Sequence, residues 1–172
     1  IRFTAAVSKR SALQTPQSPL IPAATIAPPS PQQCHVAKLE FHPGMISYSD
    51  LMEVREETKG SVFRGACFAW FRMRAPVFEG TEMCAMARVA AAADSGNGIS
   101  GFLDFQRYTY VNADLTVNLF KDPVSEWIGM RSQTYIGPGT SVGMAESLLY
   151  DEEGLIGHAT QSLFISTRKA NL

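Results

Sequence analysis

Long hydrophobic runs are absent from this sequence, and so is an excess of charge of either sign. No stretch reaches the roughly 18 apolar residues that a membrane-spanning helix needs, so we expect no membrane partner. Lys and Arg number 15 against 16 for Asp and Glu, which gives a formal net charge of -1. Nucleic-acid-binding proteins usually carry a basic excess on one face, so we expect no nucleic-acid partner. Hydrophobic residues make up 45% of the 172 residues, enough for one packed domain.

Cysteine is also scarce. The three cysteines, Cys34, Cys67 and Cys84, are widely spaced and form neither a zinc-binding pattern nor a disulfide scaffold. We therefore predict a protein without a metal site of this kind, in a reducing compartment, by default the cytoplasm. The chain starts at Ile1 without a signal segment, and we interpret it as a fragment or a processed product.

Proline, by contrast, is concentrated near the start of the chain. Six of the ten prolines lie between Pro16 and Pro31. A segment so poor in backbone N–H donors predicts an extended linker. Residues 1–7 alternate between apolar and less apolar side chains, which is typical of one strand without a local partner. We expect residues 1–34 to be the last strand of a preceding module with its linker, and residues 35–172 to form the main domain.

Hydrophobic patterns along that domain predict strands on both sides of one helix. Thr81 is the predicted N-cap of the helix, whose apolar stripe ends at Ala93. The predicted strands cover residues 51–57, 65–74, 108–120, 127–136, 143–150 and 155–166. This order predicts an α+β fold in which a curved antiparallel sheet wraps around one central helix.

Five segments carry a resemblance to a known family. They are RVAAAADSGNG at 88–98, NADLTV at 112–117, EWIG at 126–129, LYDEEG at 149–154 and ATQSL at 159–163. In this order and spacing they resemble the C-terminal half of acyl-CoA thioesterase II-like proteins, which are double hotdog enzymes. The resemblance runs mainly from Glu53 to Arg168. It implies a hotdog fold for residues 35–172, with most of a first hotdog domain expected to be absent from this chain.

The resemblance also implies a catalytic site. In that family, an Asp at the end of the central helix, a Ser or Thr on the next long strand and a Gln on the last strand order the hydrolytic water. By position these correspond to Asp94, Asn112 and Gln161, so an amide stands where the family has a hydroxyl. An amide both donates and accepts hydrogen bonds, so Asn112 can still bind water. The implied roles are Asp94 as base and the two amides as water-orienting groups, without a cofactor.

The residues themselves leave alternatives open at each position. Asp94 ends the predicted helix, where the macrodipole disfavours negative charge by roughly 0.3–1 kcal/mol. The alternative is that Asp94 starts an Asx-turn. Gln161 lies on an apolar strand face and must find a partner, since an unpaired buried amide destabilises a fold by about 1–3 kcal/mol. Asn112 and Asp114 share the polar face of their strand, where a solvent-facing role is the alternative.

Other chemically tempting residues are predicted to be structural. We expect Cys67 and Cys84 in the core, together with Met83, Met86 and Trp70. His158 alternates onto the strand face opposite Gln161. Scattered basic residues are predicted to serve solubility, and contact of some of them with coenzyme A phosphates is the alternative. They are Arg64, Arg72, Arg74, Arg88, Arg107, Lys121 and Arg131.

The sequence therefore predicts hydrolysis of acyl-CoA thioesters to free fatty acid and coenzyme A, with the acyl chain in an apolar tunnel between helix and sheet. The alternative is a non-catalytic hotdog module that binds acyl chains or supports assembly. A hotdog hydratase is less favoured, because no His lies between His42 and His158. A sheet with one helix leaves a face and an edge to cover, so the expected partner is a second hotdog half or another copy of the chain.

Overall fold

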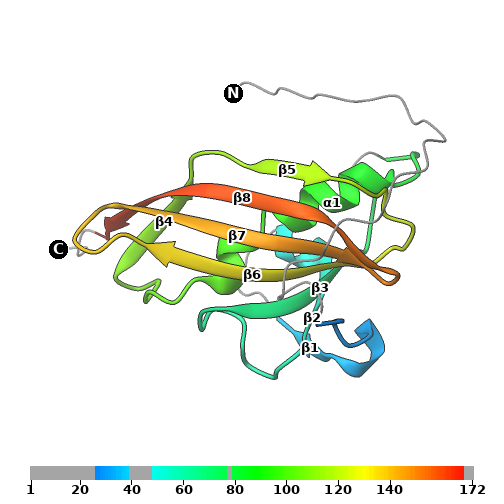
Figure 1. Cartoon of the computed structure of the whole chain (residues 1–172), viewed down its shortest axis with the longest axis horizontal. Helices are drawn as coiled ribbons and strands as arrows, with labels where there is room; N and C mark the ends of the chain where they lie inside the picture. The colour runs from blue at the N-terminus through cyan, green and yellow to red at the C-terminus, as the bar shows by residue number, and fades with distance from the viewer. Residues whose placement is uncertain (1–25, 39–47, 77–78, 169–172) are drawn as a thin grey trace.

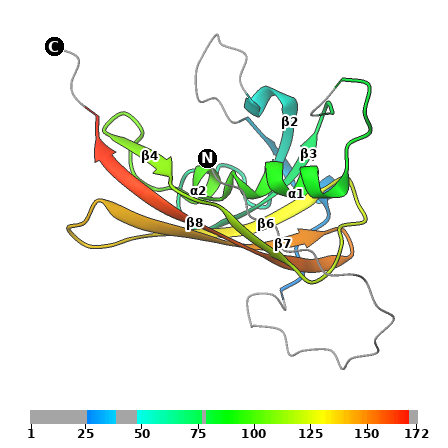
Figure 2. The same cartoon turned by 90° about the horizontal axis from the view of Figure 1, so that it is seen from above.

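The computed structural model of the chain describes residues 26–38, 48–76 and 79–168. The predicted strand over residues 1–7 and most of the proline-rich linker lie outside these residues. Within them, one antiparallel sheet of eight strands curves around the helices, which confirms the predicted α+β architecture (Figures 1 and 2).

The strands are hydrogen-bonded in the order β1-β2-β3-β6-β7-β8-β4, and β5 also pairs with β8. Their bounds are β1 (His35–Ala37), β2 (Met52–Glu56), β3 (Cys67–Met73), β4 (Tyr108–Asn112), β5 (Thr116–Leu119), β6 (Ile128–Ile136), β7 (Val142–Asp151) and β8 (Gly154–Thr167). Short 3-10 turns form at η2 (Pro31–Gln33) and η3 (Tyr48–Leu51). The predicted ranges of β2, β3, β6, β7 and β8 are correct to within two residues.

The curved sheet has an inner face that packs against the helices and an outer face that does not. Figure 2 shows both helices on one side of the sheet. Alternation along β3 sends Ala69 and Phe71 into the inner core and Phe68 and Trp70 into an outer aromatic cluster. Each large side chain buried this way stabilises the fold by about 1.5–3 kcal/mol. β3 is therefore buried on both faces, as its continuous apolar run predicts.

The end of the proline-rich segment covers that outer cluster. The indole Nε1 of Trp70 donates to the carbonyl of Pro29 at 2.8 Å, and Arg55 Nη1 donates to the carbonyl of Pro31 at 3.1 Å. Cys34 is buried against the same aromatic side chains. Residues 29–34 are thus packed onto the sheet.

Helix α1 (Ala85–Ala93) begins later than predicted. Its N-cap is Cys84, whose Sγ accepts a hydrogen bond from Ala87 N at 3.3 Å, so the prediction of Thr81 as cap is wrong. Two core predictions fail for the same reason: Cys84 and Met86 lie in the exposed first turn, because the buried stripe of α1 begins only at Val89.

A second short helix, α2 (Gly96–Ser100), follows where a turn was predicted. Its sequence GNGIS consists largely of weak helix formers, so local propensity gives no sign of it. No helix among the described residues is long and apolar enough to cross a membrane.

The single strand predicted over residues 108–120 is wrong. The structure has two strands there, and both pair with β8. Val111 in β4 is 54% exposed on the outer side, whereas Val117 in β5 packs against the inner core. Odd-numbered side chains therefore point outward in β4 but inward in β5, which is impossible within one uninterrupted strand.

A β-bulge separates the halves. Asn112 lies opposite Leu163, but Thr116 lies opposite Thr160, so residues 113–115 face only two residues of β8. One extra residue is thereby inserted into the β4–β5 side, and side-chain parity changes across it.

Candidate functional site

The structure brings the three predicted site residues together at the end of α1. Asp94 is the C-cap residue of α1, Asn112 ends β4, and Gln161 lies in the middle of β8. Gln161 Nε2 donates to the main-chain carbonyl of Asp94 at 2.9 Å. Asn112 Nδ2 lies 3.3 Å from Asp94 Oδ1 and 3.4 Å from the same carbonyl. We call these three residues the Asp94 cluster.

Gln161 is buried, with 2% of its surface exposed, on the inner face that its alternation predicts. Its Oε1 accepts from Asn97 N at 2.9 Å, while its Nε2 donates to Asp94. One side chain thus satisfies the main chain on both sides of the α1–α2 junction. The buried amide thereby has the hydrogen-bond partners that it requires. The same bonds anchor to the sheet the turn on which Asp94 lies.

A layer of small polar side chains lies beneath α2, and the sequence analysis missed it. Ser100 Oγ lies 2.7 Å from Thr134 Oγ1, and Ser132 Oγ lies 2.8 Å from Ser147 Oγ; all four are buried. A Cβ at Gly96 would lie 2.9 Å from Ser147 Oγ, so the helix backbone touches this layer directly. The available signal was the placement of Ser and Thr at inward positions of β6 and β7.

The Asp94 side chain is exposed, unlike that of Gln161. Among the described residues, Asn112 Nδ2 donates to its carboxylate, at a distance typical of a weak hydrogen bond. The carboxylate therefore retains lone pairs for another donor. An exposed, ionisable carboxylate beside the Asn112 amide is an arrangement that can bind and polarise a water molecule.

Asp114 bonds across the sheet. Its Oδ1 accepts from Ser162 N at 2.8 Å and its Oδ2 from Ser162 Oγ at 2.9 Å. Ala113 N donates to the Ser162 carbonyl at 2.8 Å. The carboxylate takes the place of a strand carbonyl at the bulge.

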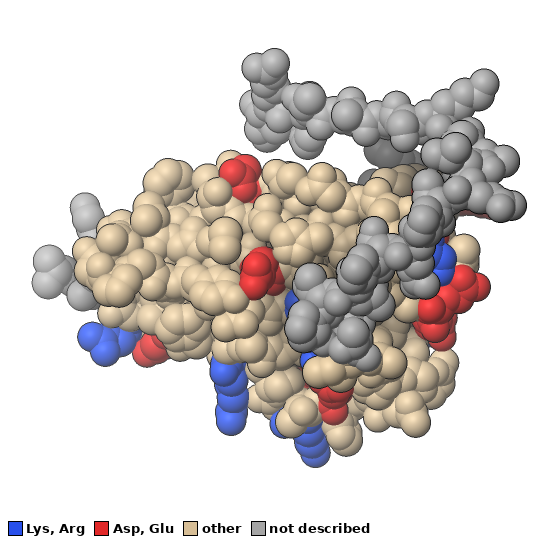
Figure 3. Space-filling view, in the orientation of Figure 1, with Lys and Arg blue, Asp and Glu red and all other residues tan. Residues whose placement is uncertain are grey.

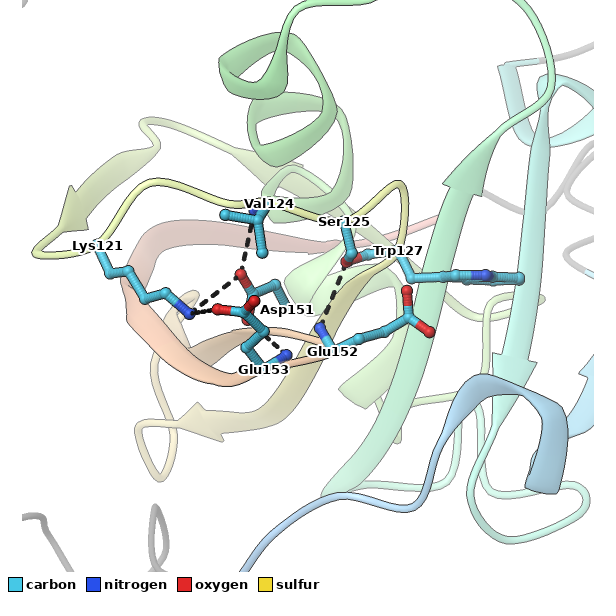
Figure 4. Close-up of polar contacts among 7 residues, drawn as sticks. All are labelled: Lys121, Val124, Ser125, Trp127, Asp151, Glu152 and Glu153. Carbon is cyan, nitrogen blue, oxygen red and sulfur yellow. Dashed lines mark hydrogen bonds and ion pairs between the residues drawn. The ribbon is translucent and has the colours of Figure 1, made fainter.

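A second carboxylate cluster lies at the β7–β8 turn, shown in Figure 4. Asp151 has a fully buried side chain and accepts from Val124 N at 3.2 Å and Glu153 N at 2.9 Å. Lys121 Nζ is 3.6 Å from Asp151 and 2.7 Å from Glu153 (Figure 4). These contacts tie the loop before β6 to the turn, and they leave Asp151 inaccessible to substrate.

A cavity of about 340 Å³ lies on the outer face, beside the loop that joins β2 to β3. Its lining includes the outward side chains of three strands, namely Arg131, Gln133, Glu146, Leu148 and His158. None of the Asp94 cluster lines it. The predicted acyl tunnel between helix and sheet is therefore a different place and stays a prediction.

The cavity lining includes three charged side chains, Glu57, Arg131 and Glu146. Figure 3 shows few acidic or basic side chains on this view of the molecule. The guanidinium of Arg131 lies over the Phe68 ring at 5.1 Å and near Glu57, and its Nε and Nη2 are buried without a hydrogen-bond partner among the described residues. Arg131 is thus packed into the sheet, contrary to the expectation of a purely solubilising role.

Thiol and metal chemistry find no support in the described residues. Burial raises the pKa of the Cys67 thiol to about 12, so it stays protonated near neutral pH, where a nucleophilic cysteine must ionise. Its place in the core confirms the prediction for this residue. Across residues 26–38, 48–76 and 79–168, no three His, Cys, Asp or Glu side chains gather as a metal site requires.

Comparison with known proteins identifies the family. A model of the acyl-CoA thioesterase C-terminal domain matches residues 26–165, whereas no curated protein matches the chain. A structure from Thermobifida fusca provisionally named a thioesterase II has a TM-score of 0.65 and 17% identity, covering 90% of this chain and 58% of its own.

Two further solved structures are similar in fold to this chain. A protein from Alicyclobacillus acidocaldarius described as having a hot dog fold has a TM-score of 0.60 and 13% identity, covering 94% of this chain and 60% of its own. The acyl-CoA thioesterase II TesB2 of Mycobacterium marinum has a TM-score of 0.55 and 13% identity, covering 93% and 61%. The chain thus spans about three fifths of these relatives, and the predicted hotdog fold is confirmed. With its matched region extending over most of its length, the chain belongs to the acyl-CoA thioesterase C-terminal domain family.

Proposed function

We propose that this domain hydrolyses acyl-CoA thioesters to a fatty acid and coenzyme A, with the Asp94 cluster as its catalytic site. The observation that carries the proposal is the meeting of Asp94, Asn112 and Gln161, which lie up to 67 residues apart in the chain and touch at one main-chain carbonyl. Family membership supports the reaction class.

In the proposed reaction, a water molecule donates a hydrogen bond to the Asp94 carboxylate. Asp94 removes a proton as the water oxygen attacks the thioester carbonyl carbon, forming a tetrahedral intermediate. The intermediate collapses, the carbon–sulfur bond breaks, and the proton held by Asp94 passes to the departing coenzyme A thiolate. No metal and no covalent enzyme intermediate enter these steps.

The two amides have distinct proposed roles. Gln161 holds the main chain of Asp94 in place, and its amide group has a further hydrogen-bonding site for the water. Asn112 donates to the Asp94 carboxylate and so orients it, while the Asn112 carbonyl oxygen can accept from the same water. Asn112 thus substitutes for the hydroxyl group that the family resemblance leads us to expect.

The test is thiol release from acyl-CoA substrates of several chain lengths by the wild type and Asp94→Ala. Loss of a positioned general base should lower kcat by about 10²- to 10⁴-fold. Asp104→Asn is the control, because Asp104 is an exposed turn aspartate whose side-chain Oδ1 accepts from Gln106 N, a bond that the Asn side-chain oxygen can also accept. Unfolding curves should be the same for both variants within about 0.5 kcal/mol. Unchanged turnover in Asp94→Ala would remove Asp94 from the mechanism.

A non-catalytic acyl-binding or assembly module is the second candidate. It is favoured by the bonds that already engage both polar ends of Gln161 and by the position of the cavity on the opposite face. A non-hydrolysable acyl-CoA thioether separates the two functions when its binding is measured beside thiol release. Binding without release from the thioester supports this second function.

The proposed partner is a second hotdog unit, either on the same polypeptide or in another copy, and the proposed location is the cytoplasm. Sedimentation equilibrium of the chain gives its association state. A monomer that turns over acyl-CoA would contradict the need for a partner.

A further inference from the structure

The bulge between β4 and β5 decides which face of the sheet Asn112 occupies. With the register of β5 continued without interruption, Asn112 would lie opposite Phe164, which is 58% exposed on the outer face. The extra residue places Asn112 opposite Leu163 instead, which is 2% exposed on the inner face with Gln161. Without the bulge, Asn112 would point away from Asp94.

Asp114 holds this bulge through two hydrogen bonds to a single residue of β8. Its carboxylate accepts from both the N–H and the hydroxyl of Ser162, which lies next to Gln161. A backbone N–H at a bulge loses its regular ladder partner, and a carboxylate is a strong replacement acceptor. The contact is also long-range, 48 residues in sequence, so it fixes the register of one strand against the other.

We propose that Asp114 is a positioning residue for thioester hydrolysis, which acts by locking the bulge that turns Asn112 toward Asp94. This rests on the proposed function only in so far as Asn112 contributes to turnover. The Asp114 carboxylate bonds to Ser162, and no hydrogen bond joins it to Asp94 or Gln161, so it acts through Asn112.

The activity arm of the test compares Asp114→Ala, Asn112→Ala and the double variant. Misplacing a positioning group can lower a rate by about 10²-fold, and we expect a loss of at least about tenfold in kcat for each single variant, with KM changed less than about twofold. The double variant should be no slower than the slower single variant, because both remove the same oriented amide. Losses that multiply in the double variant would overturn the proposal.

Asp114→Asn is the conservative variant. Its Oδ1 can accept from Ser162 N, and its Nδ2 can donate to Ser162 Oγ, so it should keep most of the wild-type kcat. Asp104→Asn again serves as the control for removing an exposed aspartate charge. Loss of turnover in Asp114→Asn equal to that in Asp114→Ala would contradict a positioning role.

A second arm does not depend on turnover. In ¹H–¹⁵N spectra, the side-chain amide of Asn112 is assigned by its loss in Asn112→Ala. That signal and the Ser162 amide should shift in Asp114→Ala and stay close to wild type in Asp114→Asn. An unmoved Asn112 signal in Asp114→Ala would contradict the proposal even if the chain shows no hydrolysis.

Loss of activity in Asp94→Ala alone, with Asn112→Ala fully active, would instead show that the assumed role of Asn112 is wrong. Should Asp114→Ala fail to fold, Ser162→Ala removes the hydroxyl contact alone and takes its place in both arms.

Discussion

Two aspartates end elements of this molecule in opposite ways. Asp151 closes β7 with a fully buried side chain held by Val124 N, Glu153 N and Lys121. Asp94 closes α1 with an exposed side chain and one long contact to Asn112. A carboxylate whose lone pairs are filled by protein donors stabilises structure, whereas one with capacity left can bind a water. Asp151 thus has the contacts of a stabilising residue, whereas Asp94 keeps the free lone pairs that its proposed role as general base requires.

The largest expected effect tests the Asp151 side of this comparison. Asp151→Ala leaves two backbone N–H groups without their acceptor and Lys121 without a buried partner, so we expect a loss of about 3 kcal/mol in the free energy of unfolding. Urea denaturation measures it, with the exposed Glu152→Ala as control. At temperatures where the variant is folded, kcat should match wild type. A lowered kcat there would break the assignment of Asp151 to stability alone.

Substitutions of two glycines, one near each aspartate, should have effects of intermediate size on stability. Gly96→Ala would bring a Cβ to 3.0 Å from Gln161 Oε1, so we expect about 1–3 kcal/mol of destabilisation together with a fall in kcat. Gly154→Ala forces a side chain onto a residue with φ of 132° beside Asp151 and should destabilise by about 1–2 kcal/mol without a fall in kcat. Thermal unfolding and initial rates on both variants are the measurements. Equal losses of kcat in the two variants would show that the region around Gly96 is no more important for turnover than the β7–β8 turn.

The smallest expected effect concerns Lys121. Its hydrogen bond with Glu153 raises the lysine pKa above its ordinary 10.5, so the contribution of Lys121 to stability is complete below pH 10.5 and is lost as pH rises through the raised value. The Lys121–Glu153 pair is exposed, and without Lys121 the buried Asp151 keeps both of its backbone donors. Lys121→Met should therefore lower the free energy of unfolding by less than about 1 kcal/mol near neutral pH. The difference between variant and wild type should vanish in strong alkali, as followed by urea unfolding across pH.

Cys67 contributes to a decline in stability at alkaline pH that forms the background of that experiment. Its pKa of about 12 in the folded chain exceeds the 9.0 of a free thiol, so the unfolded state loses its proton first and stability falls as pH rises above 9.0. Both proteins share this decline. A difference that persists in strong alkali would show that Lys121 contributes through packing instead of charge.

Features of the fold that repeat along the chain were predictable, and those made by distant pairs were not. Hydrophobic patterns predicted β6 to β8, and alternation along β8 placed Gln161 inward, because side-chain parity in a strand is local information. The bulge depends on Asp114 meeting Ser162 across two strands, and Asp114 taken alone has the pattern of any polar strand residue. Helix α1 begins at an N-cap formed by a thiol, and cysteine is not among the residues preferred at that position.

The same distinction applies to the site. Asp94, Asn112 and Gln161 were singled out together through family resemblance. The local sequence alone left a turn open for Asp94 and a solvent-facing role open for Asn112, and it indicated a buried, hydrogen-bonded amide for Gln161. That Gln161 uses both ends of its amide on the main chain could not be foreseen, since Asn97 and Asp94 meet it only after α2 has folded onto the sheet. The Ser and Thr layer under α2 is hidden for the same reason.

The contact between Pro29 and Trp70 has a practical consequence. A polypeptide cut just before β1 would leave the indole N–H of Trp70 without its acceptor and would strip cover from four large aromatic rings. Such a shortened protein should aggregate more readily and be less soluble than one that begins at Pro28, although both retain every residue of the proposed catalytic centre.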